Sequence, residues 1–395
     1  MTIKMTVKLK QEAAQALRQG RPLLQADDFM GEVSFNEGDQ VYLTDSKGDF
    51  LAMAYLAKQN KGSGWVYSYQ RDQVLDPSFF KQIFSRAKAK RQGLFDDELT
   101  TAFRFFNGEG DGLGGLSVDV YGDYLLIQWY SLGIYAYRAS IVEVLKEILP
   151  ACRGIVGKNR FQSQDHLASE WLAGEEAPEH FTVLEEGRRY VVRLNDHWMT
   201  GIFLDQREVR TYLQSELAVG RRVLNTFSYT GAFSVAAALG GASQTCSVDL
   251  ANRSRDLTEE QFAANGIPLA DQEIYVMDTF DYYKYAWRHD KFYDLIIMDP
   301  PSFARNKKKV FKVNKDYPKL VAEALEILSS QGDLVCSTNA SNYSLAAFKS
   351  DIEKGAKKAQ RSLRLIQEFK LPGDFPVPAH SPESDYLKVL IYRAD

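Results

Sequence analysis

The sequence is poor in cysteine and histidine and has no long apolar run. Its three cysteines, Cys152, Cys246 and Cys336, stand far apart without a C-x-x-C pair, and its five histidines are scattered. Because this spacing offers neither a disulfide framework nor a metal-ligand pattern, we expect no disulfide and no metal. No window approaches the roughly 20 apolar residues that a membrane-spanning helix needs. With no signal-peptide pattern at the N-terminus, the sequence predicts a cytoplasmic protein.

An excess of one charge is also missing. The 48 basic and 52 acidic residues give a net charge of -4, which argues against a protein that coats nucleic acid indiscriminately. Any contact with RNA would have to come from a local basic patch. Apolar residues make up 45% of the 395 positions, enough for several hydrophobic cores, so we expect two or three domains.

The chain changes its pattern three times. Residues 1–70 alternate short apolar runs with turns, which predicts a small, mostly β domain. Residues 71–100 contain the basic run 81–91 and predict a linker helix, either solvated or facing RNA. Residues 101–190 carry two hairpins separated by a helix, which predicts a small α+β domain of the order strand, strand, helix, strand, strand. Residues 191–395 form the last and largest part.

In this last part, apolar β runs alternate with helical stretches, which predicts a parallel sheet with helices on both faces. A proline-rich segment without helical pattern joins the last two strands, so we expect them to form an antiparallel hairpin. The fold class is therefore α/β, a doubly wound domain with seven strands. The strands are expected at residues 223–226, 245–248, 274–277, 295–298, 333–337, 363–369 and 386–392.

A loop rich in side chains follows the first of these strands. In open α/β sheets ligands bind beyond the carboxyl ends of the strands, and Gly231 would let the loop backbone approach a ligand there. A dehydrogenase needs glycines where a pyrophosphate crosses such a loop, so a nicotinamide-dependent oxidoreductase is disfavoured. S-adenosylmethionine (AdoMet) has no phosphate and suits this loop better. The expected cofactor-binding residues of the loop are Phe227, Ser228, Tyr229 and Gly231.

Carboxylates follow the next three strands in order. Asp249 comes after the second strand, where it could accept hydrogen bonds from both ribose hydroxyls, and Asp278 after the third, where it could accept from an adenine amino group. Asp299 opens the sequence Asp-Pro-Pro-Ser-Phe after the fourth strand, a rigid turn that also fixes the ring of Phe303. Each aspartate alone could equally be a turn residue or a helix cap. Their succession is what predicts a cofactor site.

The stretches 225–231, 299–303, 200–207 and 386–388 together resemble the bacterial class I rRNA methyltransferases of the RlmI type, over nearly the whole chain. This resemblance implies an N-terminal PUA domain, a middle domain and a Rossmann-like methyltransferase domain that uses AdoMet to modify 23S rRNA. It also implies that Asp249 and Asp278 bind the ribose and the adenine, and that Asp299 lies beside the transferred methyl group.

One position departs from the cytosine-5 enzymes of this family, which place a cysteine nucleophile after the fifth strand. Aligned from Gly332, that position is Asn339, and Cys336 lies three residues earlier, where we expect it to be buried in the strand. In having an asparagine in this loop, the sequence resembles the guanine-7 methyltransferase domain of the RlmK type. Because guanine N7 has a lone pair and needs no thiolate addition, guanine N7 is the favoured acceptor. Cytosine-5 chemistry, which would need Cys336 to reach out of its strand, is the alternative.

The residues expected at the reacting base are Asp299, Phe303 and Asn339. A basic stretch follows the Asp299 turn, and its position predicts contacts with RNA phosphates, with solvated surface as the alternative. Its members are Arg305, Lys307, Lys308 and Lys309. We expect ribosomal RNA as the partner and no membrane, and a homodimer stays open. A non-catalytic RNA-binding or ribosome-assembly factor that kept the fold is the alternative from another class.

Overall fold

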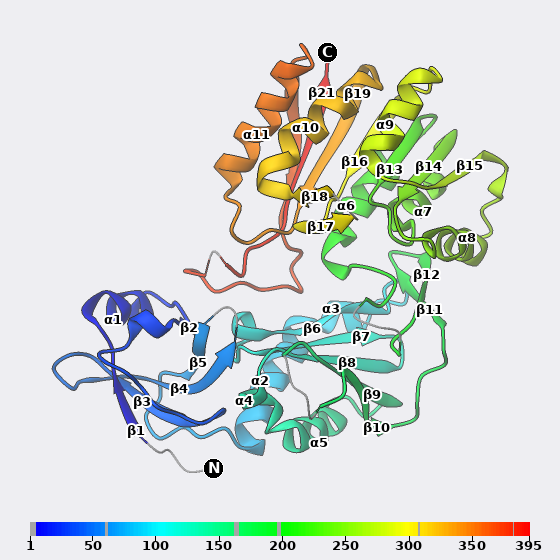
Figure 1. Cartoon of the computed structure of the whole chain (residues 1–395). Helices are drawn as coiled ribbons and strands as arrows, with labels where there is room; N and C mark the ends of the chain where they lie inside the picture. Colours follow the sequence, from blue (N-terminus) through cyan, green and yellow to red (C-terminus); the bar gives the residue numbers. More distant parts are fainter. Residues whose placement is uncertain (1–4, 60–61, 162–165, 196–198, 307–308, 382) are drawn as a thin grey trace. The chain divides into compact units, whose positions relative to one another are not determined.

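The computed structural model describes residues 5–59, 62–161, 166–195, 199–306, 309–381 and 383–395. The chain forms two compact units, each built from segments that are separate in the sequence (Figure 1). The first unit comprises Met1–Val183, Arg193–Thr200 and Gly373–Ser384, and the second Leu184–Val192, Gly201–Pro372 and Asp385–Asp395. In the described ranges, no helix is both long enough and apolar enough to cross a bilayer.

The first sheet has the order β1-β3-β4-β5-β2, in which β1 is parallel to β3 and the other pairs are antiparallel. The expected mostly β N-terminal region is confirmed. Helix α1 buries Ala13, Ala14 and Leu17, whose spacing puts them on one helical face, in a core with Val41 and Leu43 of β3. The elements are β1 (Met5–Lys8), α1 (Gln11–Arg18), β2 (Leu23–Leu24), η1 (Ala26–Asp28), β3 (Gln40–Thr44), β4 (Phe50–Gln59) and β5 (Gly62–Ser68).

The second sheet has the order β10-β9-β8-β7-β6 and is antiparallel except for the pair β8 and β9. A parallel pair needs a crossover, and α4 with α5 supplies it. Helix α2 falls within residues 71–100, where the sequence predicts a linker helix, and its apolar residues Phe80 and Phe84 belong to the core of this sheet. The elements are α2 (Pro77–Lys90), α3 (Gln92–Phe95), β6 (Ala102–Asn107), η2 (Gly108–Asp111), β7 (Leu116–Tyr121), β8 (Tyr124–Trp129), α4 (Leu132–Tyr135), α5 (Arg138–Ile148), β9 (Gly154–Asn159) and β10 (Ser169–Gly174).

The strand order expected for residues 101–190 is wrong in one respect. The hairpin of β7 and β8 is present, but the second expected hairpin, β11 (Phe181–Glu185) with β12 (Arg188–Val192), forms a two-stranded sheet of its own. Strands β6, β9 and β10 complete the five-stranded sheet instead. Strand β9 has glycines at both Gly154 and Gly157, and this composition hides a strand from a propensity argument.

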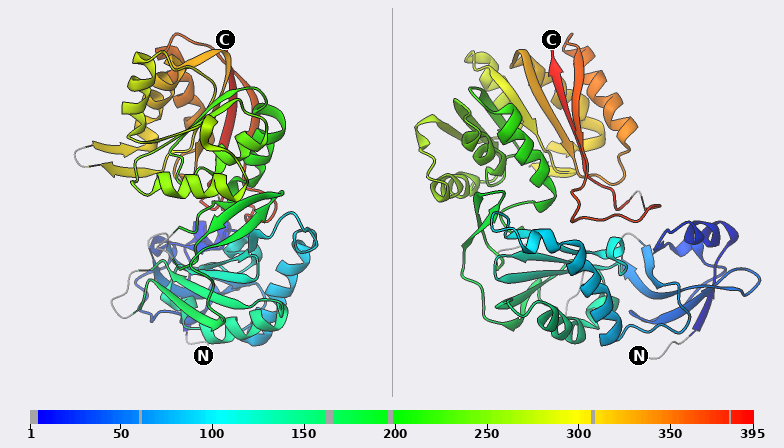
Figure 2. Two further views of the ribbon diagram at one scale, coloured as in Figure 1. Left: turned by 90° about the vertical axis from the view of Figure 1, so that its right-hand side faces the viewer. Right: turned by 180° about the vertical axis from the view of Figure 1, so that it is seen from behind.

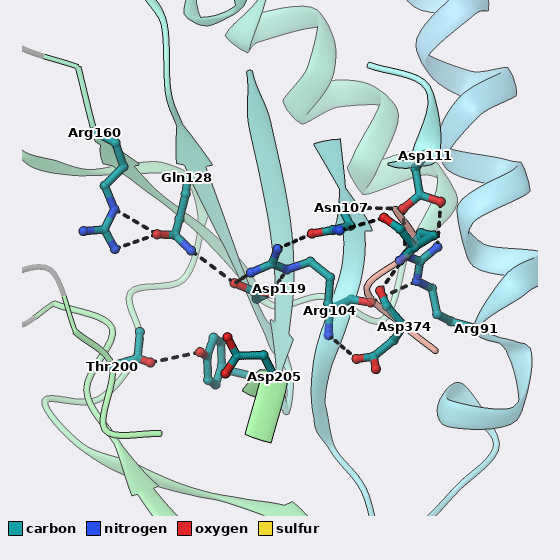
Figure 3. Close-up of polar contacts among 12 residues, drawn as sticks. Arg91, Arg104, Asn107, Asp111, Asp119, Gln128, Arg160, Thr200, Asp205 and Asp374 are labelled. Atoms are coloured by element: carbon teal, nitrogen blue, oxygen red, sulfur yellow. Dashed lines mark hydrogen bonds and ion pairs between the residues drawn. The ribbon is translucent and has the colours of Figure 1, made fainter. Parts of the chain in front are cut away.

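A segment near the C-terminus belongs to the first unit (Figure 3). Arg91 makes a buried ion pair with Asp111, with 2.7 Å between an Nη of Arg91 and Oδ2, and donates to the carbonyl of Asp374 at 2.7 Å. The side chain of Asp374 accepts from the backbone N–H of Arg104 at 2.9 Å. Asn107 Nδ2 donates to the carbonyl of Pro376 at 2.9 Å. These bonds fasten Asp374 and Pro376, from the segment that joins the last two strands of the large sheet, to the sheet of β6.

The second unit contains the expected seven-stranded sheet, in the order β15-β14-β13-β16-β19-β21-β20. The strands from β15 to β19 are parallel, and β21 is antiparallel to both β19 and β20. The doubly wound fold and the antiparallel final hairpin are therefore confirmed. A short hairpin that the sequence did not predict, β17 (Phe303–Asn306) with β18 (Lys309–Lys312), follows the Asp299 turn. The sheet strands are β13 (Arg222–Thr226), β14 (Gln244–Asp249), β15 (Gln272–Val276), β16 (Tyr293–Met298), β19 (Leu328–Thr338), β20 (Leu363–Phe369) and β21 (Lys388–Ala394).

Helices cover both faces of this sheet because its strands are apolar on both sides. Leu224 of β13 packs in one core with α9, α10 and α11, whereas its neighbour Val223 packs in another with α6 and α7. Figure 1 shows α10 and α11 on one face, and Figure 2 shows the sheet from behind. The helices are η3 (Leu204–Gln206), α6 (Arg207–Tyr212), η4 (Leu213–Leu217), α7 (Ala232–Leu239), α8 (Ser254–Ala264), η5 (Leu269–Asp271), α9 (Thr279–Arg288), α10 (Val313–Glu326) and α11 (Leu345–Lys358).

Candidate active site

The loop between β13 and α7 has a strained backbone. Phe227 and Tyr229 have φ values of 56° and 51°, in the left-handed region that residues other than glycine rarely adopt. Gly231, with a φ of 78°, faces α8 so closely that a Cβ would lie 2.6 Å from Cγ2 of Thr258. Two strained residues in one short loop are typical of backbone that is held for function. Ser228 is buried in the same loop and donates its N–H to the carbonyl of Val248 at 3.1 Å.

The carboxylate of Asp249 is fixed by this loop. Its Oδ2 accepts from the N–H of Tyr229 and its Oδ1 from the N–H of Ala251, both at 2.9 Å. Each carboxylate oxygen has a second lone pair, so an Asp249 oriented in this way can still accept from ribose hydroxyls. The residue lies at the end of β14, partly buried.

Asp278 caps helix α9. Its Oδ1 accepts from the N–H groups of Phe280 and Asp281 at 3.1 and 3.3 Å. The capping role, which the sequence offered as the alternative to cofactor binding, is thus present, and a capping carboxylate stays available as an acceptor. Exposed apolar side chains stand near both carboxylates in the sequence. Leu250 follows Asp249 and is 47% exposed, and Val276 stands two residues before Asp278 and is 36% exposed. Two carboxylates, apolar surface and a glycine turn suit an adenosine, so these residues fit AdoMet.

Asp299, which follows β16, is held by side chains from distant segments. Gln206 Nε2 lies 3.3 Å from Oδ1 of Asp299 and donates to Oγ of Ser337 at 2.9 Å. Burial raises the pKa of Asp299 to about 6; the charge of Asp205 adds to this, and the bond from Ser337 and the charge of Arg210 oppose it. The carboxylate is therefore ionised at neutral pH but close to titration.

The structure brings Asn339 to the Asp299 turn. Ser302 Oγ donates to Oδ1 of Asn339 at 2.8 Å, and Asn339 is exposed. Phe303, at the start of β17, is 58% exposed. Cys336, by contrast, is fully buried in the core on the α10 side of the sheet, and this burial raises the pKa of its thiol far above the ordinary value. A buried, protonated thiol cannot act as a nucleophile where it stands.

Several residues of this region were not found by sequence reasoning. They are Gln206 and Ser337, described above, together with Asp205, Tyr386 and Lys388. Tyr386 donates its hydroxyl to Oδ2 of Asp205 at 2.8 Å, and Lys388 Nζ donates to the carbonyls of Tyr386 and Ala340 at 3.0 and 3.2 Å. The signal was present, since stretches 200–207 and 386–388 carried part of the family resemblance. Their partners, however, stand far away in the chain, 131 residues in the case of Gln206 and Ser337.

Two of the four expected RNA-contacting residues lie on the β17–β18 hairpin. Arg305 is exposed on β17, and Lys309 begins β18. Lys307 and Lys308 lie outside the described residues. In the part of the chain that is described, no group of three or more His, Cys, Asp or Glu side chains could hold a metal ion.

Comparisons with known proteins agree on one family. The family model of S-adenosylmethionine-dependent methyltransferases matches residues 148–393, and a model of PUA-like domains matches residues 7–69. YwbD of Bacillus subtilis, named as a candidate ribosomal RNA large subunit methyltransferase, is 43% identical over 389 residues, 98% of either chain. Ribosomal RNA large subunit methyltransferase I of Klebsiella pneumoniae is 30% identical over 356 residues, 89% of this chain and 88% of that protein.

A solved structure is similar over the whole length. SMU.776, described as a candidate methyltransferase and solved in complex with SAH, is 45% identical to this chain. The superposition covers 99% of this chain and 100% of the other, with a TM-score of 0.94. The fold of this chain therefore closely matches that of a structure solved with SAH.

Proposed function

This chain belongs to the family of S-adenosylmethionine-dependent methyltransferases and carries an N-terminal PUA-like region, and from that premise we propose that it methylates a base of large-subunit (23S) ribosomal RNA, with guanine N7 as the acceptor. The names of the relatives from Bacillus and Klebsiella support the choice of RNA. We propose the same division of the chain as before, into a PUA-like RNA-binding domain (1–70), a linker helix (71–100), a small α+β domain (101–190) and the methyltransferase domain (191–395).

The ends of β13, β14 and β15 would hold the cofactor. When bound, AdoMet supplies an electrophilic methyl group. Asp249 would accept from the ribose hydroxyls and Asp278 from the adenine amino group. Gly231, which packs closely against Thr258 of α8, would bring the loop backbone up to the adenosine. Phe227, Ser228 and Tyr229 complete this wall.

The observation that carries the choice of guanine is the pairing of Asn339 with Ser302 at the Asp299 turn. An amide can hydrogen-bond to the edge of a base but cannot add to a pyrimidine ring, and guanine N7 needs no such addition. Catalysis then consists of holding the base in line with the methyl group, a positioning task for Asp299, Phe303 and Asn339. The burial of Cys336 supports the same choice, because cytosine-5 chemistry would need an accessible thiolate.

The basic stretch after the Asp299 turn supports an RNA substrate through its position. Arg305 is exposed on the strand that begins at Phe303. We propose that Arg305, Lys307, Lys308 and Lys309 contact RNA phosphates where the base enters, which would give the net-acidic chain a local site of favourable charge.

Mass spectrometry of nucleosides from the 23S rRNA of a deletion strain tests the proposal. We expect one 7-methylguanosine to disappear, to return with the wild-type protein, and to stay absent with an Asp299→Ala variant. Loss of a 5-methylcytidine instead would replace guanine by cytosine as the target. An unchanged rRNA, together with a protein that does not bind AdoMet, would point to the non-catalytic assembly factor.

A further inference from the structure

Within the second unit, a buried ion pair holds the backbone of the stretch 201–207 in place. An Nη of Arg210 donates to the carbonyl of Phe203 at 2.8 Å, and the same guanidinium makes two hydrogen bonds with Glu185, at 2.7 and 2.6 Å. The side chains of Arg210 and Glu185 are only 2% and 0% exposed. A buried guanidinium whose bonds are satisfied in this way fixes the position of the carbonyl that it holds.

Three further contacts hold the rest of this stretch. Gln206 donates to Ser337 of β19, and Asp205 accepts from Tyr386. At the other end, Gly201 has a φ of 114° and passes so close to β12 that a Cβ would lie 2.7 Å from the carbonyl oxygen of Val191. The stretch is therefore anchored at its start, middle and end.

The aromatic ring of Phe203 is exposed on this anchored backbone. The ring is 45% exposed, and its centroid lies 5.6 Å from that of Tyr229. Tyr229 is the strained residue whose N–H binds Asp249, so its position is fixed as well. A single exposed phenylalanine is ordinary. A rigidly held one, paired with a second ring at a methyltransferase site, offers the flat apolar face on which an unstacked nucleobase can lie.

Gln206 carries an unused acceptor next to Asp299. The residue is 3% exposed, and its Nε2 is engaged with Asp299 and Ser337. Its Oε1 is buried and has no hydrogen-bond partner among the described residues. Buried acceptors without a partner are rare in folded proteins and call for an explanation. A donor that arrives with the substrate would supply the missing bond.

We infer that residues 201–207 form the wall that receives the target base, with Phe203 stacking on its ring and Gln206 Oε1 accepting a hydrogen bond from its exocyclic amino group. The inference rests on the proposed function, because it needs an RNA base as the substrate. Guanine and cytosine both carry an exocyclic amino group that can donate to this oxygen. A base must leave its stack to be methylated at such a site, and stacking on protein rings offsets part of that cost.

Variants of Phe203 test the stacking. Steady-state kinetics on 23S rRNA from the deletion strain should give a KM for RNA that is about tenfold higher for Phe203→Ala and for Phe203→Leu. Calorimetry should give the wild-type Kd for AdoMet in both. Trp287→Ala is the matched control, since Trp287 is an aromatic of 58% exposure on α9, and it should leave the KM unchanged. A wild-type KM for Phe203→Leu would overturn the stacking, because leucine keeps the apolar volume but lacks the aromatic face.

Variants of Gln206 test the acceptor. Gln206→Met has a similar volume without the amide, and it should lower kcat/KM for RNA about tenfold. Gln206→Glu keeps an acceptor oxygen but puts a second carboxylate beside Asp299, so its activity should return only at a higher pH than in the wild type. A merely structural glutamine would lower the Tm of Gln206→Met and leave its kcat/KM for RNA unchanged. A wild-type kcat/KM for Gln206→Met in a folded protein would remove Gln206 from the base site.

The same assays separate this inference from the function on which it rests. If the wild-type protein transfers no methyl group to the unmodified rRNA, the proposed function fails. If the wild type is active and the Phe203 and Gln206 variants match it, only the inference fails.

Discussion

The two halves of the candidate site hold their carboxylates in different ways. At the end of β14, Asp249 is fixed by backbone N–H groups, those of Tyr229 and Ala251. At the end of β16, Asp299 is contacted by the side chain of Gln206, which stands 93 residues earlier in the chain. The cofactor half is thus built by local backbone geometry, whereas the transfer half is assembled from side chains of distant segments. We expect mutations in the cofactor half to change the affinity for AdoMet, and mutations in the transfer half to change the rate of methyl transfer.

The largest effect should come from Asp299→Asn, which keeps the shape of the side chain and removes its charge. Because the reacting groups must be aligned closely, loss of this anchor should lower kcat about 100-fold. The Kd for AdoMet should change much less, since the adenosine is held elsewhere. Single-turnover methylation of rRNA and calorimetry would measure the two quantities. An equal loss in both would show that the two halves are not separable.

The contrast between the halves also explains what could be predicted from the sequence. Asp249, Asp278 and Asp299 could be proposed because each stands at or just beyond the end of a strand and parallel strands end at one edge of the sheet. The contacts of Gln206 could not be predicted, because neither spacing nor composition relates a residue to a partner 131 positions away.

The same limit applies to the fold. The seven strands of the large sheet were found because short β runs alternate with helical stretches along this part of the chain. In the first unit, the sheet of β6 to β10 was only half predicted, because a strand such as β9, with Gly154 and Gly157, gives little signal alone. The hairpin of β17 and β18 was missed because two strands of four residues each lie within a basic stretch that is typical of solvated surface.

The next effect concerns Asn339 and Cys336, which lie close in sequence but in different surroundings. Asn339→Ala should lower kcat at least tenfold, because an exposed amide bonded to Ser302 is lost beside the base. Cys336→Ala should keep the wild-type kcat and lose only stability, on the order of 1 kcal/mol, because its side chain is fully buried in the core. Methylation kinetics would measure kcat of the two variants, and thermal unfolding would measure their stability.

A trapping experiment sharpens this contrast. RNA that contains 5-fluorocytosine should form no stable adduct with the wild-type protein, since direct transfer to guanine leaves no covalent intermediate. An adduct that disappears in Cys336→Ala would establish cytosine chemistry and would require the strand around Cys336 to open.

In the cofactor half, Asp249→Ala should weaken AdoMet binding by roughly 1.5 to 3 kcal/mol, as expected for lost hydrogen bonds to a charged group. Asp278→Ala should weaken binding too, but it should also destabilise the protein by about 1 kcal/mol, because the cap of α9 is lost. Calorimetry and thermal unfolding of both variants distinguish the two roles. An unchanged affinity in folded Asp249→Ala would take Asp249 out of the site.

A smaller effect is expected outside both halves. Replacing Lys307, Lys308 and Lys309 by alanine should weaken RNA binding and reduce the slope of log affinity against log salt, by roughly 0.7 to 0.9 for each phosphate contact that is lost. Fluorescence titrations at several salt concentrations measure this slope, and the Kd for AdoMet serves as the internal control. A constant slope would show that the lysines are solvated surface.

The smallest effect is the pH dependence of the transfer half. If transfer needs the ionised carboxylate of Asp299, kcat should fall to half its plateau value near the pKa of about 6.

The stability contribution has the opposite sign. Burial raises the pKa of Asp299 above the ordinary value of 3.8, so its favourable contribution to folding is fully present below that value and is lost as the pH rises through about 6. As the pH rises between these two pKa values, kcat should increase while the contribution of Asp299 to the stability of the fold decreases. Profiles of kcat and Tm from about pH 5 to about pH 8 for the wild type and Asp299→Asn would show this. If the difference in Tm between the two proteins does not vary with pH, the carboxylate is not titrating in this range and the decline in kcat has another source.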